Sequence, residues 1–342
     1  MLVRVPDYFD GFSCLAGACP HSCCIGWEVV IDADTAQRYL TQPGPLGDRL
    51  RAAMQFDGED FCFPLNGGRC PFFNQENLCD IHCALGPEAT SLTCQEHPRF
   101  IEDYGPFQEI TLSAACPKAN QLLLSSAEPL AFLERHSDAP VEEGDEWLDW
   151  LVPLRDHLLI LLRDRSRPLK ERLRDFLLTA CAAQCLLDSE DMEELEAFCA
   201  APHPVSVKAE NRSGSWETAA QQCLAKLEIL EPDWEALLER WAGAPLLLFD
   251  PREPEKLERI AVYFAFRHLL KAVNDGDLLG RVQFCLLGVL TVNCLSRFVE
   301  LPEALRLFSR EIEHDADNFN TLLEDFRQTE ALALPAFLAA LE

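Results

Sequence analysis

The sequence predicts a mainly α-helical protein in which a turn-rich cysteine and metal-cluster domain is followed by a helical domain. Two observations support this prediction. Ten of the 16 cysteines fall within the first 116 residues, whereas residues 143–342 show one apolar helical pattern after another with few glycines. The change in composition predicts a cysteine-rich metal-cluster domain over residues 1–125 and a helical domain over residues 126–342.

The N-terminal domain is expected to contain short elements separated by turns. Trp27–Ile31 is rich in β-branched residues and predicts a strand. Asp34 is the predicted N-cap of a helix over Thr35–Leu40. A second turn-rich segment begins near Asn66, where Gly67 and Gly68 permit positive φ angles.

The C-terminal domain shows helical spacing of apolar residues with recognisable ends. Pro232 is expected in a first helical turn and Gly243 at a helix C-terminus. A long helix is predicted from about Glu255 to Val273, ending at the turn residues 274–276. One apolar helical face is formed by Trp147, Trp150, Leu151, Leu154 and Leu158.

Composition and charge limit the location and the partners. The chain is 48% apolar, Arg4 comes too early for a secretory signal, and the apolar runs are interrupted before bilayer length. We therefore expect a cytoplasmic protein without a membrane partner. The net charge is −28, from 57 acidic and 29 basic residues, and a surface of this sign repels nucleic acid and anionic lipid. Nucleic acid is not an expected partner.

Clustered cysteines in a reducing compartment favour metal ligation over disulfides. No Cys-x2-Cys knuckle of a zinc ribbon is present, and Gly26 and Gly86 stand where a radical-type Cys-x3-Cys-x2-Cys triad would place its third cysteine. A four-cysteine iron–sulfur cluster and one or two zinc ions are both compatible with the number of thiols. Iron–sulfur is preferred, because irregular spacing suits a larger cluster held by several loops.

The later cysteines are expected to belong to the core of the helical domain. Cys181 and Cys185 share one face of an apolar helix, and cysteine is among the residues most often buried. We therefore leave six cysteines out of the site: Cys181, Cys185, Cys199, Cys223, Cys285 and Cys294. No nucleotide-binding glycine loop, G-x-S-x-G elbow or HExxH helix is present in the sequence.

Residues 10–125 contain an ordered set of short motifs: Phe12-Ser13-Cys14, Gly17, Cys19, Ser22-Cys23-Cys24, Gly26-Trp27, Ile31-Asp32, Thr35 to Tyr39, Cys70-Pro71-Phe72-Phe73, Leu78-Cys79-Asp80-Ile81, Leu85-Gly86, Thr93-Cys94, His97-Pro98-Arg99, Leu112-Ser113 and Cys116-Pro117. The order of these motifs resembles the flagellin lysine-N-methylase family. The helix that carries Tyr263, Phe264, Arg267 and His268 is also similar to the C-terminal half of that family.

The resemblance implies that the protein transfers a methyl group from S-adenosylmethionine to lysine side chains of flagellin or of another lysine-bearing protein. It also implies a cysteine-bound 4Fe-4S cluster. Arg99 could hold the carboxylate of the donor or a cluster charge, with a surface ion pair as the alternative. The eight cysteines that match the family pattern are the candidate metal ligands: Cys14, Cys19, Cys23, Cys24, Cys70, Cys79, Cys94 and Cys116.

Methylation of lysine requires a neutral amine aligned with the methyl group of the donor, and a route for the proton. Five polar residues in the matched region could contribute, although a structural role is favoured for each of them: Asp32, Tyr39, Glu96, Tyr104 and Glu109.

Two other classes of function stay open at this stage. One is a non-catalytic protein that binds or delivers zinc or iron, since the chain has a cysteine-rich module and no nucleotide loop. The other is a helical interaction scaffold that a tightly bound zinc ion stabilises.

Overall fold

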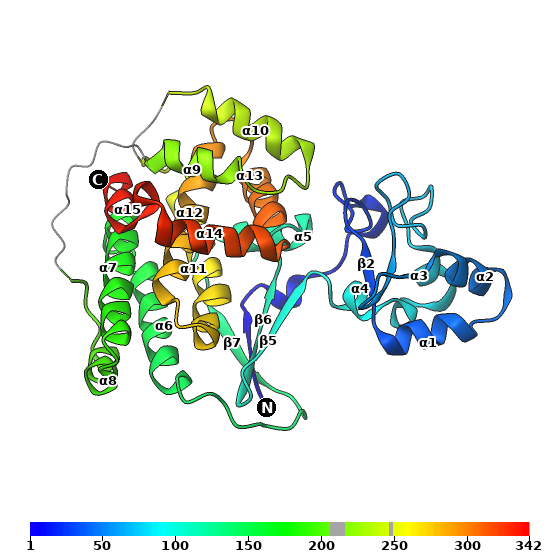
Figure 1. Ribbon diagram of the computed structural model, residues 1–342, viewed down its shortest axis with the longest axis horizontal. Helices are drawn as coiled ribbons and strands as arrows, with labels where there is room; N and C mark the ends of the chain where they lie inside the picture. Colours follow the sequence, from blue (N-terminus) through cyan, green and yellow to red (C-terminus); the bar gives the residue numbers. More distant parts are fainter. Residues whose placement is uncertain (206–215, 246–248, 342) are drawn as a thin grey trace. The chain divides into compact units, whose positions relative to one another are not determined.

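The computed structural model describes residues 1–205, 216–245 and 249–341 (Figure 1). The chain forms two compact units. The cysteine unit comprises Asp10–Phe100 and Leu112–Asn120, and the helical unit comprises Met1–Phe9, Ile101–Thr111 and Gln121–Glu342. A single cut between residues 125 and 126 does not separate these units, because residues 1–9 and 101–111 contribute strands to a sheet of the helical unit.

The prediction of a mainly α-helical protein is confirmed. In the described parts of the chain, helices α1 to α15 outnumber strands β1 to β7. The helices of the helical unit are α6 (Leu148–Arg163), α7 (Leu169–Asp188), α8 (Met192–Ala200), α9 (Trp216–Leu224), α10 (Pro232–Ala242), α11 (Pro254–His268), α12 (Leu278–Leu295), α13 (Leu301–Phe308), α14 (Ala316–Gln328) and α15 (Leu334–Ala340); α5 (Pro117–Leu124) begins in the cysteine unit and ends in the helical unit.

A four-stranded sheet of order β5-β6-β1-β7 was not predicted from the sequence. Strand β1 (Leu2–Pro6) pairs in parallel with β6 (Phe107–Leu112) and antiparallel with β7 (Phe132–His136), and β5 (Arg99–Asp103) lies beside β6. Leu2 is opposite Phe107 on one side and His136 on the other. These pairings join segments more than a hundred residues apart, which short-range sequence patterns do not reveal.

The core of the helical unit is formed around α11 and α12. Helix α12 packs against α11, α7, α13 and α14, and Gly288 allows close approach, since a Cβ atom there would lie 2.7 Å from the Phe264 ring. Helix α12 is long and apolar enough to cross a membrane by composition, but 83% of its 18-residue window is buried inside the protein. A core helix of a soluble protein has the same properties, and the predicted cytoplasmic location stays a prediction.

Two predicted helix ends in the helical unit agree with the structure, and one differs. Pro232 begins α10, and Gly243 is its C-cap. The helix predicted over 255–273 is α-helical only to His268 and continues as a 3-10 helix over Leu269–Asn274. Apolar periodicity does not distinguish these two helix types when both are buried.

The cysteine unit contains short helices around a three-stranded antiparallel sheet of order β2-β4-β3. Tyr39 stacks on Phe63, which contacts Phe72 at a ring distance of 4.7 Å. Cys70 is buried in this core, and Cys24 and Cys79 pack against it. The elements are β2 (Val29–Ile31), α1 (Ala33–Thr41), α2 (Gly44–Ala53), β3 (Gln55–Phe56), β4 (Phe61–Phe63), α3 (Asp80–Leu85) and α4 (Leu92–Glu96).

A carboxylate with no solvent exposure, Glu313, lies at the end of a π-helical turn over Ser309–Glu313. It accepts hydrogen bonds from Arg267 Nε at 2.7 Å, His268 Nε2 at 2.9 Å and Tyr263 Oη at 3.1 Å. Burial opposes ionisation, but the His268 hydrogen bond and the charge of Arg267 outweigh it and lower the pKa of Glu313 to about 2. The carboxylate therefore stays charged and ties α11 to this turn.

Two further buried carboxylates connect other elements of the helical unit. Glu109 on β6 accepts two hydrogen bonds from Arg155 on α6, at 2.7 and 2.9 Å. Glu258 on α11 is paired with Arg165 and Arg172. A buried charge that loses its partner is costly, so these pairs restrict how the helices and the sheet can pack.

The Glu313 pairing predicts a large loss of stability in Glu313→Gln. The amide keeps the shape of the side chain but removes the nearer counter-charge of the buried Arg267 and leaves it only Glu102, at 3.8 Å, which we expect to lower the free energy of unfolding by about 3–5 kcal/mol. Urea unfolding measures this change. Glu324→Gln, an exposed position on α14, is the matched control with an expected change within about 0.5 kcal/mol. Equal effects of the two substitutions would contradict the role given to Glu313.

The same pairing predicts that acid destabilises the protein. Burial lowers the pKa of His268 to about 3 in the folded protein, so the unfolded chain binds this proton more readily and stability is lost as pH falls from about 6.5 towards 3. The melting temperature of wild type should fall over this range more steeply than that of His268→Phe. Burial raises the pKa of Glu311 to about 7 and acts in the opposite direction in both proteins, so their difference reports His268 together with the hydrogen bond that lowers the pKa of Glu313. Parallel pH profiles would refute the prediction.

Candidate metal centre

The first two candidate ligands flank a 3-10 turn over Ala16–Ala18. The backbone N–H of Ala16 donates to Cys14 Sγ at 3.3 Å, and Cys19 Sγ donates to the carbonyl of His21 at 3.3 Å. A Cβ atom on Gly17 would lie 3.0 Å from the carbonyl oxygen of Glu76. This turn therefore packs closely on the loop that precedes Cys79.

Backbone hydrogen bonds link the adjacent cysteines Cys23 and Cys24 to the segment that contains Cys70. The N–H of Cys70 donates to the carbonyl of Cys24 at 2.9 Å, and Gly26 N–H donates to the Gly68 carbonyl at 2.9 Å. Gly67 and Gly68 have φ angles of 59° and 78°, the conformation that their turn was predicted to need. Cys23, Cys24 and Cys70 are thereby held within one local structure.

An asparagine turn positions Cys79. Asn74 Oδ1 accepts the N–H of Leu78 at 2.9 Å, and Asn74 Nδ2 donates to Asp80 Oδ1 at 2.9 Å. Phe73 forms an isolated β-bridge with Cys79, which is the N-cap residue of α3. The turn returns the chain so that Cys79 lies beside the segment that begins at Cys70.

Asp32 positions Cys94. Its Oδ1 caps α1 by accepting the N–H of Thr35 at 2.9 Å, and its Oδ2 accepts the N–H of Leu92 in α4 at 2.8 Å. The predicted N-cap, Asp34, was wrong: it lies in the first turn of α1. Asp32 takes the cap because the same carboxylate also reaches α4, where Ser91 accepts the N–H of Cys94.

The last candidate ligand, Cys116, directly precedes α5, and its carbonyl accepts the N–H of Asn120 at 2.9 Å. The N–H of Ser113 donates to the carbonyl of Pro98 at 2.7 Å. Residues 112–120 therefore return to the cysteine unit after β6. Cys116 thus belongs to the same compact unit as the other seven candidate ligands.

The eight candidate thiols form one connected set, because Cys23 interacts electrostatically with Cys24 and Cys94 on one side and with Cys14 on the other. Cys70 lies close enough to Cys24, Cys79 and Cys94 for their thiols to interact electrostatically, and Cys94 does so with Cys24 and Cys79. Cys116 has the same relation to Cys14 and Cys19. In the described ranges of the chain, no three or more His, Cys, Asp or Glu side chains are close enough together to hold a metal ion as they stand.

Hydrogen bonding and burial shift the pKa values of the thiols in different directions. The hydrogen bond from Cys23, together with that from Ser22, outweighs burial and lowers the pKa of Cys24 to about 7. The same contact raises the pKa of Cys23, and burial raises that of Cys70 to about 12. Metal binding deprotonates cysteine ligands, so occupation of these thiols would release protons. Thiolates are the ligands of iron–sulfur clusters and of structural zinc, and this donor set fits both.

Two further cysteines of the cysteine unit are not candidate ligands, and the thiol of one of them, Cys83, is within electrostatic reach of Cys79. Cys62 is buried on β4, and Cys83 is exposed on α3. No disulfide joins any of the 16 cysteines. Of the six cysteines assigned to the core of the helical domain, Cys199, Cys223 and Cys285 are buried, whereas Cys185 is exposed and Cys181 and Cys294 are intermediate.

Arg99 lies on β5 with its guanidinium 5.6 Å from the centre of the Phe12 ring. Binding of the donor carboxylate by Arg99 stays a prediction. Three of the five polar residues considered for proton transfer make structural contacts. Tyr39 Oη donates to the Ala89 carbonyl at 2.8 Å, Asp32 caps α1, and Glu109 is paired with Arg155.

The helical unit holds buried polar atoms without a hydrogen-bond partner, and one of them belongs to Tyr104, which was considered above for proton transfer. The hydroxyls of Tyr8 and Tyr104 and the Nδ1 atom of His268 are buried and have no hydrogen-bond partner among the described residues. Glu313, which binds His268, also escaped the sequence analysis, because no local motif surrounds it. The only signal was the similarity of the helix that carries Arg267 and His268 to a family pattern.

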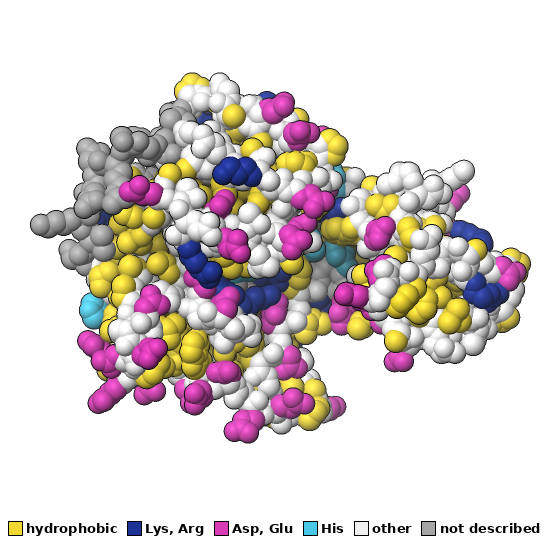
Figure 2. All heavy atoms as spheres, viewed as in Figure 1, with side chains coloured by type: hydrophobic (Ala, Val, Ile, Leu, Met, Phe, Trp, Pro, Cys, Tyr) yellow, Lys and Arg dark blue, Asp and Glu magenta, His cyan; other side chains and the backbone are white. Residues whose placement is uncertain are grey.

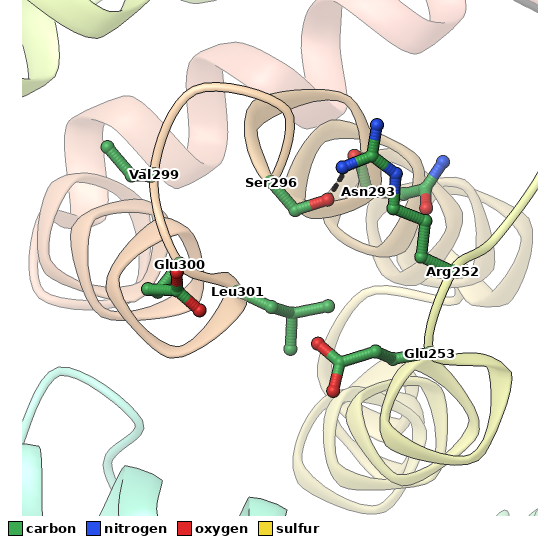
Figure 3. A pocket seen from close by; sticks show the side chains of 7 residues that line it. All are labelled: Arg252, Glu253, Asn293, Ser296, Val299, Glu300 and Leu301. Carbon is green, nitrogen blue, oxygen red and sulfur yellow. Dashed lines mark hydrogen bonds between the residues drawn. The ribbon is translucent and has the colours of Figure 1, made fainter.

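A small cavity of about 150 Å³ lies between the start of α11 and the segment that joins α12 to α13 (Figure 3). Arg252 and Glu253 lie on one side in this view, with Asn293 beside Arg252, and Val299 and Glu300 lie on the other (Figure 3). None of the predicted site residues lines this cavity.

The chain is 28% identical over 142 residues to the flagellar biosynthetic protein FliU of Salmonella muenchen, an alignment that spans 40% of this chain and 84% of that protein. It is also 28% identical over 140 residues to the lysine-N-methylases of Salmonella typhimurium and Salmonella choleraesuis. The chain is similar to lysine-N-methylases over part of its length. That part is 39% of this chain and 35% of each methylase. No family model and no solved structure matches the chain.

The site geometry predicts that Asp32→Ala loosens α1 and α4 together. Loss of an N-cap costs about 1 kcal/mol, and this carboxylate serves two helix starts, so we expect a loss of about 2 kcal/mol. Amide hydrogen exchange should quicken at Thr35 and Leu92. Asp34→Ala, at an exposed position two residues away, is the control and should leave both amides unchanged. Equal effects of the two substitutions would restore Asp34 as the cap.

Proposed function

We propose that this chain is an S-adenosylmethionine-dependent protein lysine N-methyltransferase that contains a cysteine-bound iron–sulfur cluster. The observation that carries the proposal is the similarity to proteins named lysine-N-methylase. The gathering of eight thiols in one compact unit supports the metal dependence. Flagellin, or another protein with accessible lysines, is the proposed substrate, because one relative is named as a flagellar biosynthetic protein.

The proposed reaction moves one methyl group. The neutral ε-amine of the substrate lysine attacks the methyl carbon of the sulfonium, a C–N bond forms as the C–S bond breaks, and the sulfur leaves with the bonding pair as a neutral thioether. The methylated ammonium then loses its proton to solvent. A bound 4Fe-4S cluster would supply a redox-active centre and a cross-link between loops.

The charge of the chain suits such a substrate. With 57 acidic and 29 basic residues, the protein attracts cationic segments. Acidic side chains are spread over many elements of the face shown in Figure 2, and basic ones are fewer. In this proposal Arg99 binds the carboxylate of the donor, since a guanidinium pairs with a carboxylate through two parallel hydrogen bonds.

Anaerobically purified protein tests the proposal directly. We expect absorption near roughly 400 nm together with iron and sulfide, and flagellin incubated with the protein and S-adenosylmethionine should gain about 14 Da per methyl group. Calorimetry measures donor binding separately. An intact cluster without affinity for the donor would refute the methyltransferase. Colourless protein with tightly bound zinc would favour the scaffold, and metal that passes readily to an acceptor would favour metal delivery.

Substitution of Arg99 tests its proposed contact with the carboxylate of the donor. Loss of a hydrogen bond to a charged group costs about 1.5–3 kcal/mol, so Arg99→Ala should raise the dissociation constant of the donor by roughly tenfold or more. Arg49→Ala is the matched control, since Arg49 also lies over a phenylalanine ring, that of Phe72, at 5.2 Å. Equal donor affinity in the two variants would remove Arg99 from the donor site.

A further inference from the structure

Strand β7 forms one edge of the four-stranded sheet of the helical unit and pairs with β1 on its inner side. The backbone N–H of Asp7 donates to the Ala131 carbonyl at 2.9 Å, and that of Ser137 donates to the Met1 carbonyl at 2.9 Å. Along an antiparallel strand, residues that bond to the partner alternate with residues whose N–H and C=O groups point away from it. By this alternation, the backbone groups of three residues face the outer edge of the sheet: Phe132, Glu134 and His136.

This outer edge of β7 is open to an additional strand. Among the described residues, none outside β1 forms a backbone hydrogen bond with β7 over 132–136, and β1 is the one element that packs extensively on it. Leu133 is 42% exposed, and the Glu134 side chain is 60% exposed. An edge with unpaired backbone groups can bind an extended peptide through main-chain hydrogen bonds.

A row of alternating charges crosses the sheet and ends at this edge. Arg4 on β1 lies opposite Glu109 on β6 and opposite Glu134 on β7. Arg4 Nη1 is 3.8 Å from Glu109 Oε1, and Arg4 Nε donates to Glu134 Oε1 at 3.2 Å. The row runs from negative to positive to negative, so the position opposite Glu134 on an added strand suits a cation.

The side chains around this row leave one negative charge in excess. Asp156 Oδ1 accepts a hydrogen bond from Arg155 Nε at 2.8 Å, and Asp156 Oδ2 lies 3.8 Å from Arg4 Nη1. Arg155 also pairs with Glu109. The five side chains therefore carry three negative and two positive charges, and the more exposed carboxylates are those of Glu134 and Asp156. One lysine or arginine of a bound segment would balance the group.

The charges favour a basic segment over a second copy of this chain. Two β7 strands paired about Glu134 would place two carboxylates opposite each other, and like charges in that position are destabilising. The net charge of −28 adds to the repulsion between copies. A basic segment is attracted by the same charges.

We propose that the outer edge of β7 docks an extended, basic segment of the protein substrate, which adds to the sheet as a further strand with a lysine or arginine opposite Glu134. This inference rests on the proposed function and adds how the substrate is recognised. The residue opposite Glu134 is bound as a cation and anchors the segment, because a protonated amine has no lone pair with which to accept a methyl group. The methylated lysine is a different residue of the substrate.

Amide hydrogen exchange of the intact chain tests the docking geometry. The probe is a peptide of about seven residues that alternates threonine and valine around one central lysine. It should slow exchange at the outward-facing amides of Phe132, Glu134 and His136 and leave Leu133, which already bonds to β1, unchanged. The same peptide with glutamate in place of lysine is the matched control and should bind roughly tenfold less tightly. Equal affinity for the two peptides, or protection that leaves out these three amides, would overturn the proposal.

Two substitutions at His136 separate the backbone from the side chain. His136→Pro removes an outward-facing N–H without removing a bond to β1, and an edge strand tolerates proline at such a position. His136→Ala keeps the N–H. We expect His136→Pro to weaken binding of the lysine peptide by roughly tenfold and His136→Ala to bind it within about twofold of wild type. Equal affinities of the two variants would overturn the proposal.

Substitution of Glu134 tests the charge, and it carries the test if circular dichroism shows that His136→Pro fails to fold. Glu134→Gln should reduce the preference for the lysine peptide over the glutamate peptide to about twofold. Glu324→Gln, on α14, is the control and should keep the wild-type preference. An unchanged preference in Glu134→Gln would overturn the pairing.

Methylation of flagellin and sedimentation of the same proteins separate this inference from the proposed function. Peptide docking at β7 without methyl transfer would refute the methyltransferase alone. Methyl transfer whose KM for flagellin is the same in wild type, folded His136→Pro and Glu134→Gln would overturn the docking site alone. A dimer of wild type that dissociates in His136→Pro would assign the edge to a second copy and would also overturn the proposal.

Discussion

The Asp32 carboxylate joins two parts of the cysteine unit that lie 60 residues apart. One oxygen caps α1 and the other accepts a backbone N–H of α4, so the starts of both helices are fixed by one side chain. Short helices leave most of their terminal N–H groups without internal partners, and a carboxylate satisfies them well. The position of Cys94 relative to β2 depends on this contact, and with it the proximity of the Cys94 thiol to those of Cys24 and Cys79.

The helical unit depends on a different constraint, which is the pairing of buried charges. Each of three buried carboxylates forms an ion pair with at least one arginine: Glu109, Glu258 and Glu313. The free energy needed to desolvate two charges offsets most of the free energy gained by pairing them, so these contacts add little net stability. Removal of one partner nevertheless destabilises the fold strongly, because it leaves a buried charge unpaired. They therefore favour one arrangement of helices and sheet over alternatives with the same apolar contacts.

Similarity to lysine-N-methylases covers about two fifths of the chain. The thiol arrangement and the similarity are independent observations: one is a property of the folded chain and the other of its sequence. Both are compatible with a methyltransferase that carries a metal centre. The polar network around Glu313 on α11 and the π-helical turn is a third feature, and its buried groups titrate far from their ordinary values.

The sequence by itself determined the mainly α-helical class, the strand that ends at Ile31, the start of α10 and the concentration of cysteines, because these follow from local composition and spacing. Only the tertiary structure decided that Asp32 and not Asp34 caps α1, since the choice depends on the N–H of Leu92. It also decided the partners of Glu313 and which candidate thiols lie near one another. Each of these depends on contacts between segments distant in the chain, which no local pattern encodes.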